Sequence, residues 1–193
     1  MIRFDNVPPE IMQAMCTPMH QVLPSTPVTV PSRTSPSSMT TISSGALYIG
    51  SISAIHDVDL LRSHNVSHLV QVLDAPWLPP LGEKEGFTSF KISILDATSA
   101  DLKPYLENAC TSIDRALREG RSVLVHCQQG VSRSAAVVIA YLIRNHGMSY
   151  DVAYNHLLRK RACIKPNSGF VNALKDWENT WRRPSLGQRR FTS

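Results

Sequence analysis

The sequence predicts an α/β fold, with a central, mostly parallel sheet that is flanked by helices on both faces. Two observations support this fold class. Short apolar, β-branched runs alternate with segments of helical spacing, and this alternation continues from about residue 45 to residue 181. Such an order is typical of parallel sheets, in which a helix joins each strand to the next across one face.

The predicted elements follow one another regularly along this part of the chain. Apolar and β-branched residues cluster in four expected strands, at residues 46–49, 68–73, 87–95 and 122–126. Apolar residues recur every three or four positions in five expected helices, at residues 56–64, 102–118, 132–146, 150–161 and 167–181. Gly147 is expected to end the third helix and Asn167 to cap the start of the fifth.

The first 41 residues are expected to form a flexible tail. Residues 24–44 contain four prolines, many serines and threonines, and a single charged residue. This composition buries too little apolar surface to offset the entropy of ordering the chain. Within the tail, Pro9 to Met15 could form one or two helical turns. The chain is therefore expected to divide into an N-terminal tail (1–41), one folded domain (42–181) and a basic C-terminal tail (182–193).

Composition excludes several classes of protein. With 42% hydrophobic and 18% charged residues in 193, the chain resembles an ordinary globular protein. Its four cysteines lack the spacing of a zinc site, its first 25 residues predict no signal peptide, and it has no 18-residue apolar segment. We therefore expect no membrane span, and a reducing setting in the cytoplasm or the nucleus. The net charge of +5 is expected to attract phosphorylated, acidic partners rather than nucleic acid.

The most informative segment lies where the last predicted strand ends. The apolar run 122–126 stops at Cys127, a short turn follows, and Arg133 stands six positions after the cysteine. The apolar run 135–143 then begins a helix. Such a strand–loop–helix junction directs backbone N–H groups and the positive end of a helix dipole into one small space. An anion the size of phosphate fits there, and the cysteine is expected to be held as a thiolate.

This arrangement predicts phosphoryl transfer through a cysteine. Cys127 is the expected nucleophile. The alternative, a buried structural cysteine, is disfavoured because Gly130 and Arg133 follow Cys127 at three and six positions in the same loop. Arg133 offers a planar fork for two phosphate oxygens, and Gly130 lets the backbone fold tightly around the anion. The expected substrate-binding residues form the loop itself: Gln128, Gln129, Gly130, Val131, Ser132 and Arg133. No metal or other cofactor is expected, because the arginine and the backbone dipoles supply the charge stabilisation.

Residues 126–134, His-Cys-x-x-Gly-x-Ser-Arg-Ser, resemble the signature of the cysteine-dependent protein phosphatases, in the form typical of the dual-specificity branch. The resemblance continues into residues 140–143 and 161–170 and covers roughly residues 42–181. It is closest to the small atypical dual-specificity phosphatases. It implies the phosphatase fold of that family, a phosphocysteine intermediate, and a role for Ser134 in stabilising the Cys127 thiolate by a hydrogen bond.

A general acid is also needed, because an alkoxide or phenolate leaves poorly unless it is protonated. Asp96 is the best candidate: it directly follows a predicted strand and stands 31 residues before Cys127, which is similar to the position of the acid in the family. Asp101 is the alternative, but its place before Leu102 suits the capping of a helix.

The variable loop positions bear on the class of substrate. Relatives that act on phosphoinositides often carry Lys or Arg in this loop, whereas Gln128 and Gln129 are neutral. The expected reaction is therefore hydrolysis of phosphotyrosine and phosphoserine or phosphothreonine in proteins. Two alternatives remain: a non-protein phosphate, such as an RNA 5′ end or a phosphoinositide, and a phosphoprotein-binding module with little activity.

Overall fold

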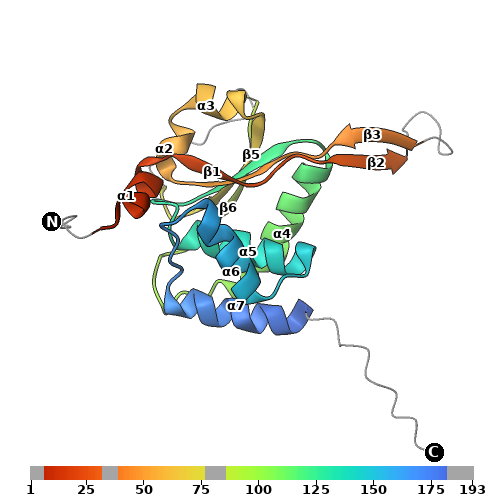
Figure 1. Ribbon diagram of the computed structural model, residues 1–193. Coiled ribbons are helices and arrows are strands. Elements are labelled where there is room, and N and C mark those ends of the chain that lie inside the picture. Colours follow the sequence, from red (N-terminus) through yellow and green to blue (C-terminus); the bar gives the residue numbers. More distant parts are fainter. Residues whose placement is uncertain (1–6, 32–38, 77–85, 182–193) are drawn as a thin grey trace, which may run out of the picture.

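The computed structural model describes residues 7–31, 39–76 and 86–181. A five-stranded sheet forms its centre, in the order β1-β4-β7-β5-β6 (Figure 1). Its strands span Met19–Leu23 (β1), Leu47–Gly50 (β4), Val66–Val72 (β5), Thr88–Ile92 (β6) and Ser122–His126 (β7). Strands β4 to β7 pair in parallel and β1 pairs antiparallel with β4, which confirms the mostly parallel sheet. Strands β2 (Pro27–Pro31) and β3 (Met39–Ser43) form a separate hairpin that projects from the body.

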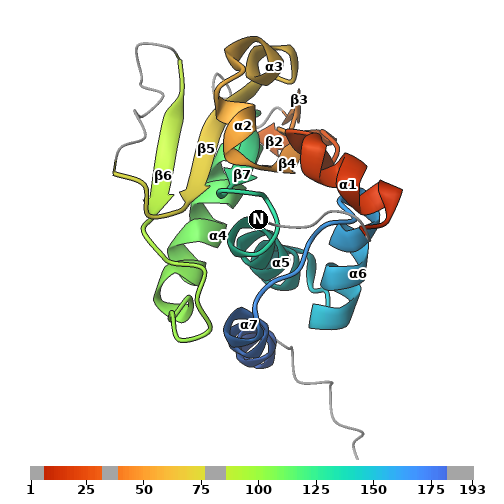
Figure 2. The same ribbon diagram turned by 90° about the vertical axis from the view of Figure 1, so that its left-hand side faces the viewer.

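Helices cover both faces of the sheet, as the sequence predicts (Figure 2). One face carries the four longest: α4 (Lys103–Arg118), α5 (Arg133–His146), α6 (Tyr150–Lys160) and α7 (Ser168–Trp181). The other face carries α2 (Ile52–Ile55) and α3 (Val58–Ser63), and α1 (Pro9–Cys16) precedes β1. No helix among the described residues is long and apolar enough to cross a membrane.

Successive side chains of a strand point to opposite faces of the sheet, so each strand contributes residues to two separate cores. One set of strand residues faces the core that includes α4 to α7: Leu47, Ile49, Val70, Val72, Val123 and Val125. The residues between them pack with α2 and α3: Tyr48, Leu69 and Leu124. Because β7 lies in the middle of the sheet and is buried along its whole length, its end is fixed firmly in space.

The helix boundaries agree with the sequence to within a few residues. Gly147 adopts a left-handed conformation (φ 65°) and ends α5, and the Asn167 side chain accepts a hydrogen bond from the Phe170 N–H at the start of α7. Strand β6 ends at Ile92, earlier than expected, and beyond it the Ile94 carbonyl accepts a hydrogen bond from Arg133 at the start of α5. Residues 182–193, the expected basic tail, lie outside the described part of the chain.

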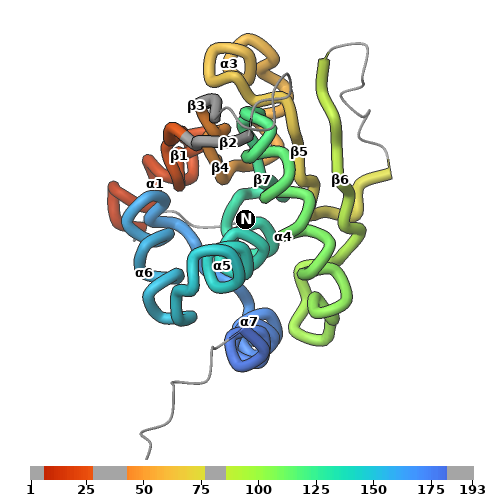
Figure 3. Tube along the Cα trace, turned by 90° about the vertical axis from the view of Figure 1, so that its right-hand side faces the viewer, coloured from red at the N-terminus to blue at the C-terminus, as the bar shows by residue number. Residues whose placement is uncertain are grey.

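The prediction of a flexible tail over residues 1–41 is wrong for residues 27–31 and 39–41, which belong to the paired strands β2 and β3. It is also wrong for residues 9–23, here called the N-terminal segment. They form α1 and β1, and β1 completes one edge of the sheet by pairing with β4 (Figure 3). Val22 is 1% exposed, and the His156 ring of α6 binds its carbonyl at 3.2 Å. Burial of these apolar side chains and the backbone pairing with β4 stabilise this segment.

Removing residues 1–23 is therefore expected to lower the melting temperature by at least about 5 °C. The deletion exposes the apolar surface that Ala14, Met19 and Val22 cover, where full burial of one large apolar side chain stabilises by about 1.5–3 kcal/mol. Thermal unfolding of the full and shortened chains measures the difference. An unchanged melting temperature, with fast hydrogen exchange along β1, would show that the segment does not pack on the sheet in solution.

Candidate active site

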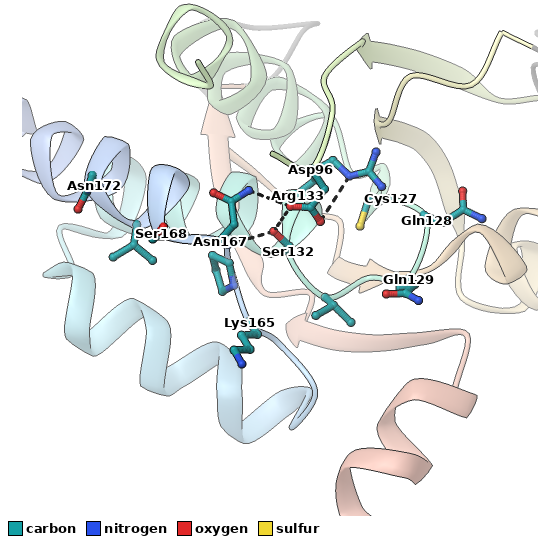
Figure 4. Close-up of a pocket in the computed structure, with 13 residues that line it drawn as sticks. Asp96, Cys127, Gln128, Gln129, Ser132, Arg133, Lys165, Asn167, Ser168 and Asn172 are labelled. Carbon is teal, nitrogen blue, oxygen red and sulfur yellow. Dashed lines mark hydrogen bonds and ion pairs between the residues drawn. The ribbon is translucent and has the colours of Figure 1, made fainter. Parts of the chain in front are cut away.

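The residues expected at the site meet where β7 ends and α5 begins (Figure 4). Cys127 directly follows β7, and Arg133 is the first residue of α5. Residues 127–133, here called the cysteine loop, curve around one end of a pocket of about 770 Å³. Apart from Gly130, every residue of the loop lines this pocket, and Asp96 lines it from the segment after β6.

The backbone of the cysteine loop is held with its carbonyls turned outward. The carbonyl of Gln128 accepts from the Ile52 N–H at 3.3 Å, and that of Val131 accepts from the Lys165 N–H at 2.8 Å. The carbonyls of Gln129 and Gly130 both accept from the Arg161 guanidinium, at 3.0 and 2.9 Å.

The N–H groups of the loop consequently turn inward. A trans peptide points its N–H away from its own carbonyl, so four successive outward carbonyls direct the N–H groups of residues 129–132 toward the centre of the loop. The N-terminus of α5, a helix of 14 residues, adds the positive end of its dipole. The loop is thus shaped to bind an anion.

Gly130 is required by the tightness of this loop. Its φ is +69°, a conformation that other residues rarely adopt. A Cβ there would also lie 2.6 Å from the Gly50 carbonyl oxygen and 2.8 Å from the Arg161 guanidinium. The loop therefore packs directly on β4 and on the end of α6, with no room for a side chain.

The Cys127 sulfur lies at the base of the pocket and is 2% exposed as a residue. The Gly130 N–H donates to it at 3.2 Å, and the Ser134 hydroxyl lies 3.3 Å from it. The preceding His126 is fully buried, and burial lowers the pKa of its ring to about 4, so this ring is neutral near pH 7.

Arg133 and Asp96 face each other across the mouth of the pocket. The Arg133 Nε lies 3.8 Å from an Asp96 carboxylate oxygen, Oδ2. This Nε is buried and has no hydrogen-bond partner among the described residues. The other oxygen, Oδ1, accepts from the Ser132 hydroxyl at 2.7 Å and from the Asn167 side-chain amide at 2.8 Å. Oδ1 is thus committed to positioning the carboxylate, whereas Oδ2 faces Arg133 at the edge of the pocket.

Asp101, the alternative acid, is placed elsewhere. Its carboxylate accepts a hydrogen bond from the Lys103 N–H at the start of α4, although Leu102 occupies the N-cap position itself, and it does not line the pocket.

Several pocket residues were not among the expected site residues. They all come from the connection between α6 and α7 and from α7 itself: Lys165, Pro166, Asn167, Ser168, Val171 and Asn172. Asn167 has two roles, because one end of its amide caps α7 while the other binds Asp96. Gly169 packs this connection against the segment after Asp96, since a Cβ there would meet the Thr98 carbonyl at 2.1 Å.

Comparison with known proteins agrees with this geometry. Residues 47–180 match the model of the dual specificity phosphatase catalytic domain. Dual specificity protein phosphatase 1 of Arabidopsis thaliana is 37% identical over 134 residues, which are 69% of this chain and 66% of that protein. Dual specificity protein phosphatase 1B of the same plant is 35% identical over 134 residues, 69% of this chain and 78% of that protein.

Solved structures show the same fold. The human tyrosine phosphatase-like serine/threonine/tyrosine-interacting protein superposes with a TM-score of 0.70 at 27% identity, over 86% of this chain and 98% of that one. A mouse putative dual specificity phosphatase, solved in complex with zinc tungstate, superposes with a TM-score of 0.69 at 28% identity, over 93% of this chain and 94% of that one.

Proposed function

The chain belongs to the dual specificity phosphatase family, and we propose that it hydrolyses phosphotyrosine and phosphoserine or phosphothreonine in proteins through a phosphocysteine intermediate. The observation that carries this proposal is the cysteine loop. Four outward carbonyls, the inward N–H groups that go with them, Cys127 at the base and the Arg133 guanidinium form a cradle for a phosphoryl group.

In the first step the Cys127 thiolate attacks phosphorus, and the bond between phosphorus and the ester oxygen breaks. The backbone N–H groups and Arg133 hold the other phosphate oxygens while charge is redistributed among them. Asp96 donates its proton to the departing ester oxygen, so that an alcohol or a phenol leaves.

In the second step water attacks the phosphocysteine. Asp96, now a carboxylate, takes a proton from this water, the sulfur–phosphorus bond breaks, and inorganic phosphate is released. The Ser134 hydroxyl, 3.3 Å from the sulfur, can donate a hydrogen bond to the thiolate as it leaves. Neither step needs a group other than these side chains, the backbone and water.

The charges in the pocket favour a protein phosphoester over a polyphosphate or an inositol lipid. Gln128 and Gln129 lie at the exposed end of the loop and are neutral. Of the described residues that line the pocket, only Arg133 and Lys165 are cationic, and Arg133 would bind the phosphate that is being cleaved. A phosphate surrounded by further phosphates would meet few counter-charges here.

A panel of substrates tests this choice. Phosphotyrosyl and phosphothreonyl peptides are expected to be hydrolysed with a kcat/KM at least about tenfold above that of a 5′-triphosphorylated RNA or a phosphoinositide. Faster release of phosphate from the RNA or the lipid would contradict the protein specificity. Tight binding of the peptides without turnover would instead identify a phosphoprotein-binding module.

A further inference from the structure

Arg161, directly after α6, is buried beneath the cysteine loop with 0% exposure. Its guanidinium has acceptors on both sides. On one side Nε and one terminal nitrogen donate to the carbonyls of Gly130 and Gln129. On the other side the second terminal nitrogen donates to the Thr17 carbonyl at 2.9 Å and lies 2.9 Å from His20 Nδ1.

This buried cation has no carboxylate for a partner among the described residues. Burial lowers the pKa of Arg161, and the nearby thiols of Cys163 and Cys127 raise it. An arginine nevertheless stays protonated in proteins, so a fixed positive charge lies behind the nucleophile. This charge lies near Cys163 and Cys127, and a positive charge favours the negative form of a neighbouring sulfur.

The other side of the guanidinium is held by the N-terminal segment. Thr17 and His20 stand at the junction of α1 and β1, more than a hundred residues from Arg161 in sequence. Burial and the charge of Arg161 lower the pKa of His20, so its ring is neutral near pH 7 and its Nδ1 can accept the hydrogen bond. The N-terminal segment therefore supplies the remaining acceptors, and together with the loop carbonyls they fix the position and orientation of the Arg161 guanidinium.

We infer that Arg161 is a positioning residue for catalysis and that the N-terminal segment, through Thr17 and His20, holds it in place beneath the cysteine loop. Arg161 binds two of the four carbonyls that are turned outward. The peptide that joins Gln129 to Gly130 shows the consequence: its carbonyl binds Arg161, and its N–H donates to the Cys127 sulfur at 3.2 Å. Releasing the carbonyl frees this peptide to rotate, which removes a donor from both the sulfur and the bound phosphate.

The inference rests on the proposed function and is tested in the full chain with Arg161→Lys and His20→Ala, and with Arg161→Met for the effect of the charge. Arg161→Lys keeps the charge but cannot reach acceptors on both sides, because an ammonium lacks the planar fork. His20→Ala leaves Arg161 in place and removes one of its anchors. The measurements are kcat/KM for an aryl phosphate, inhibition by inorganic phosphate, and the rate at which iodoacetamide alkylates Cys127, followed by mass spectrometry well below the melting temperature.

Arg161→Lys is expected to lower kcat/KM by about tenfold or more and to weaken phosphate inhibition in parallel, because preorganised donors contribute much of the stabilisation in such sites. The alkylation rate of Cys127 depends on the positive charge behind its sulfur. This rate should therefore change less in Arg161→Lys, which keeps the charge, than in Arg161→Met, which loses it. His20→Ala is expected to shift kcat/KM and phosphate inhibition in the same direction by about threefold.

Two matched controls separate positioning from simple packing. Arg159→Lys changes an exposed arginine near the end of the same helix, and His156→Ala removes a different contact of β1, the one to the Val22 carbonyl. Both should leave kcat/KM within about twofold of the wild type. If Arg161→Lys lowers the melting temperature but leaves kcat/KM and phosphate inhibition unchanged, Arg161 is only a packing residue. If His156→Ala reproduces the effect of His20→Ala, docking of β1 as a whole is responsible.

Failure of the proposed function would appear differently. A wild-type chain that hydrolyses no phosphoester can still bind inorganic phosphate, which would protect Cys127 from iodoacetamide. Loss of this protection in Arg161→Lys, with protection kept in Arg159→Lys, would support the role of Arg161 in shaping the loop without any turnover. Equal protection in both variants would overturn it.

Discussion

Replacing Cys127 with serine is expected to abolish hydrolysis while leaving phosphate binding measurable. A serine hydroxyl at this position is a far weaker nucleophile than a thiolate, so the phosphoenzyme should not form, and turnover should fall by at least about a thousandfold. The anion cradle should survive, because its shape depends on hydrogen bonds to Ile52, Arg161 and Lys165 rather than on the sulfur. Initial rates with an aryl phosphate measure the first effect, and calorimetric titration with a phosphopeptide measures the second.

Cys16→Ser is the matched control, because Cys16 is exposed at the end of α1 and does not line the pocket. It should retain wild-type turnover and phosphopeptide binding. Residual activity of Cys127→Ser above about one per cent of the wild type would remove Cys127 as the nucleophile. Loss of binding together with turnover would mean that the sulfur is needed to hold the loop in shape.

The core of the site could be predicted because it is local in sequence. The buried strand, the cysteine loop and the start of α5 are contiguous, so one pattern contains the nucleophile, the cradle and Arg133. The end of a central strand also fixes where this segment lies. By contrast, Asn167 and Arg161 act on Asp96 and on the loop from more than thirty residues away. In the sequence Asn167 appears as a helix cap, and Arg161 is one of several basic residues near the end of a helix.

The N-terminal segment was missed for a related reason. Residues 19–23 contain His20 and Gln21 and have a weak strand pattern, and they adjoin a stretch rich in proline, serine and threonine. They become a strand because β4 offers an unpaired edge and because Val22 can be buried there. Composition indicates disorder for residues 24–44, and extending that expectation back to residue 1 overlooks this short ordered piece. The interaction with Arg161 shows that the segment also reaches the cysteine loop from behind.

Replacing Asp96 with asparagine is expected to slow poor leaving groups much more than good ones. The assistance from a proton donor grows with the basicity of the departing oxygen, and general acid catalysis is typically worth about 10²–10⁴-fold. Turnover of a phosphothreonyl peptide, which releases an alkoxide, should fall by about this factor. Turnover of p-nitrophenyl phosphate, which releases a stable phenolate, should fall far less. Rates for a series of aryl phosphates of graded leaving-group basicity measure the difference.

The geometry makes asparagine a suitable probe at this position. The oxygen that accepts from Ser132 and Asn167 is retained in the amide, so the side chain should keep its place and lose only the oxygen that would carry the transferred proton. Asp101→Asn is the control: it alters a carboxylate at the start of α4, and it should change stability slightly without changing the dependence on the leaving group. A steeper dependence in Asp101→Asn than in Asp96→Asn would reverse the assignment. An equal loss for all leaving groups in Asp96→Asn would make Asp96 a residue that positions Ser132 and Arg133 rather than the acid.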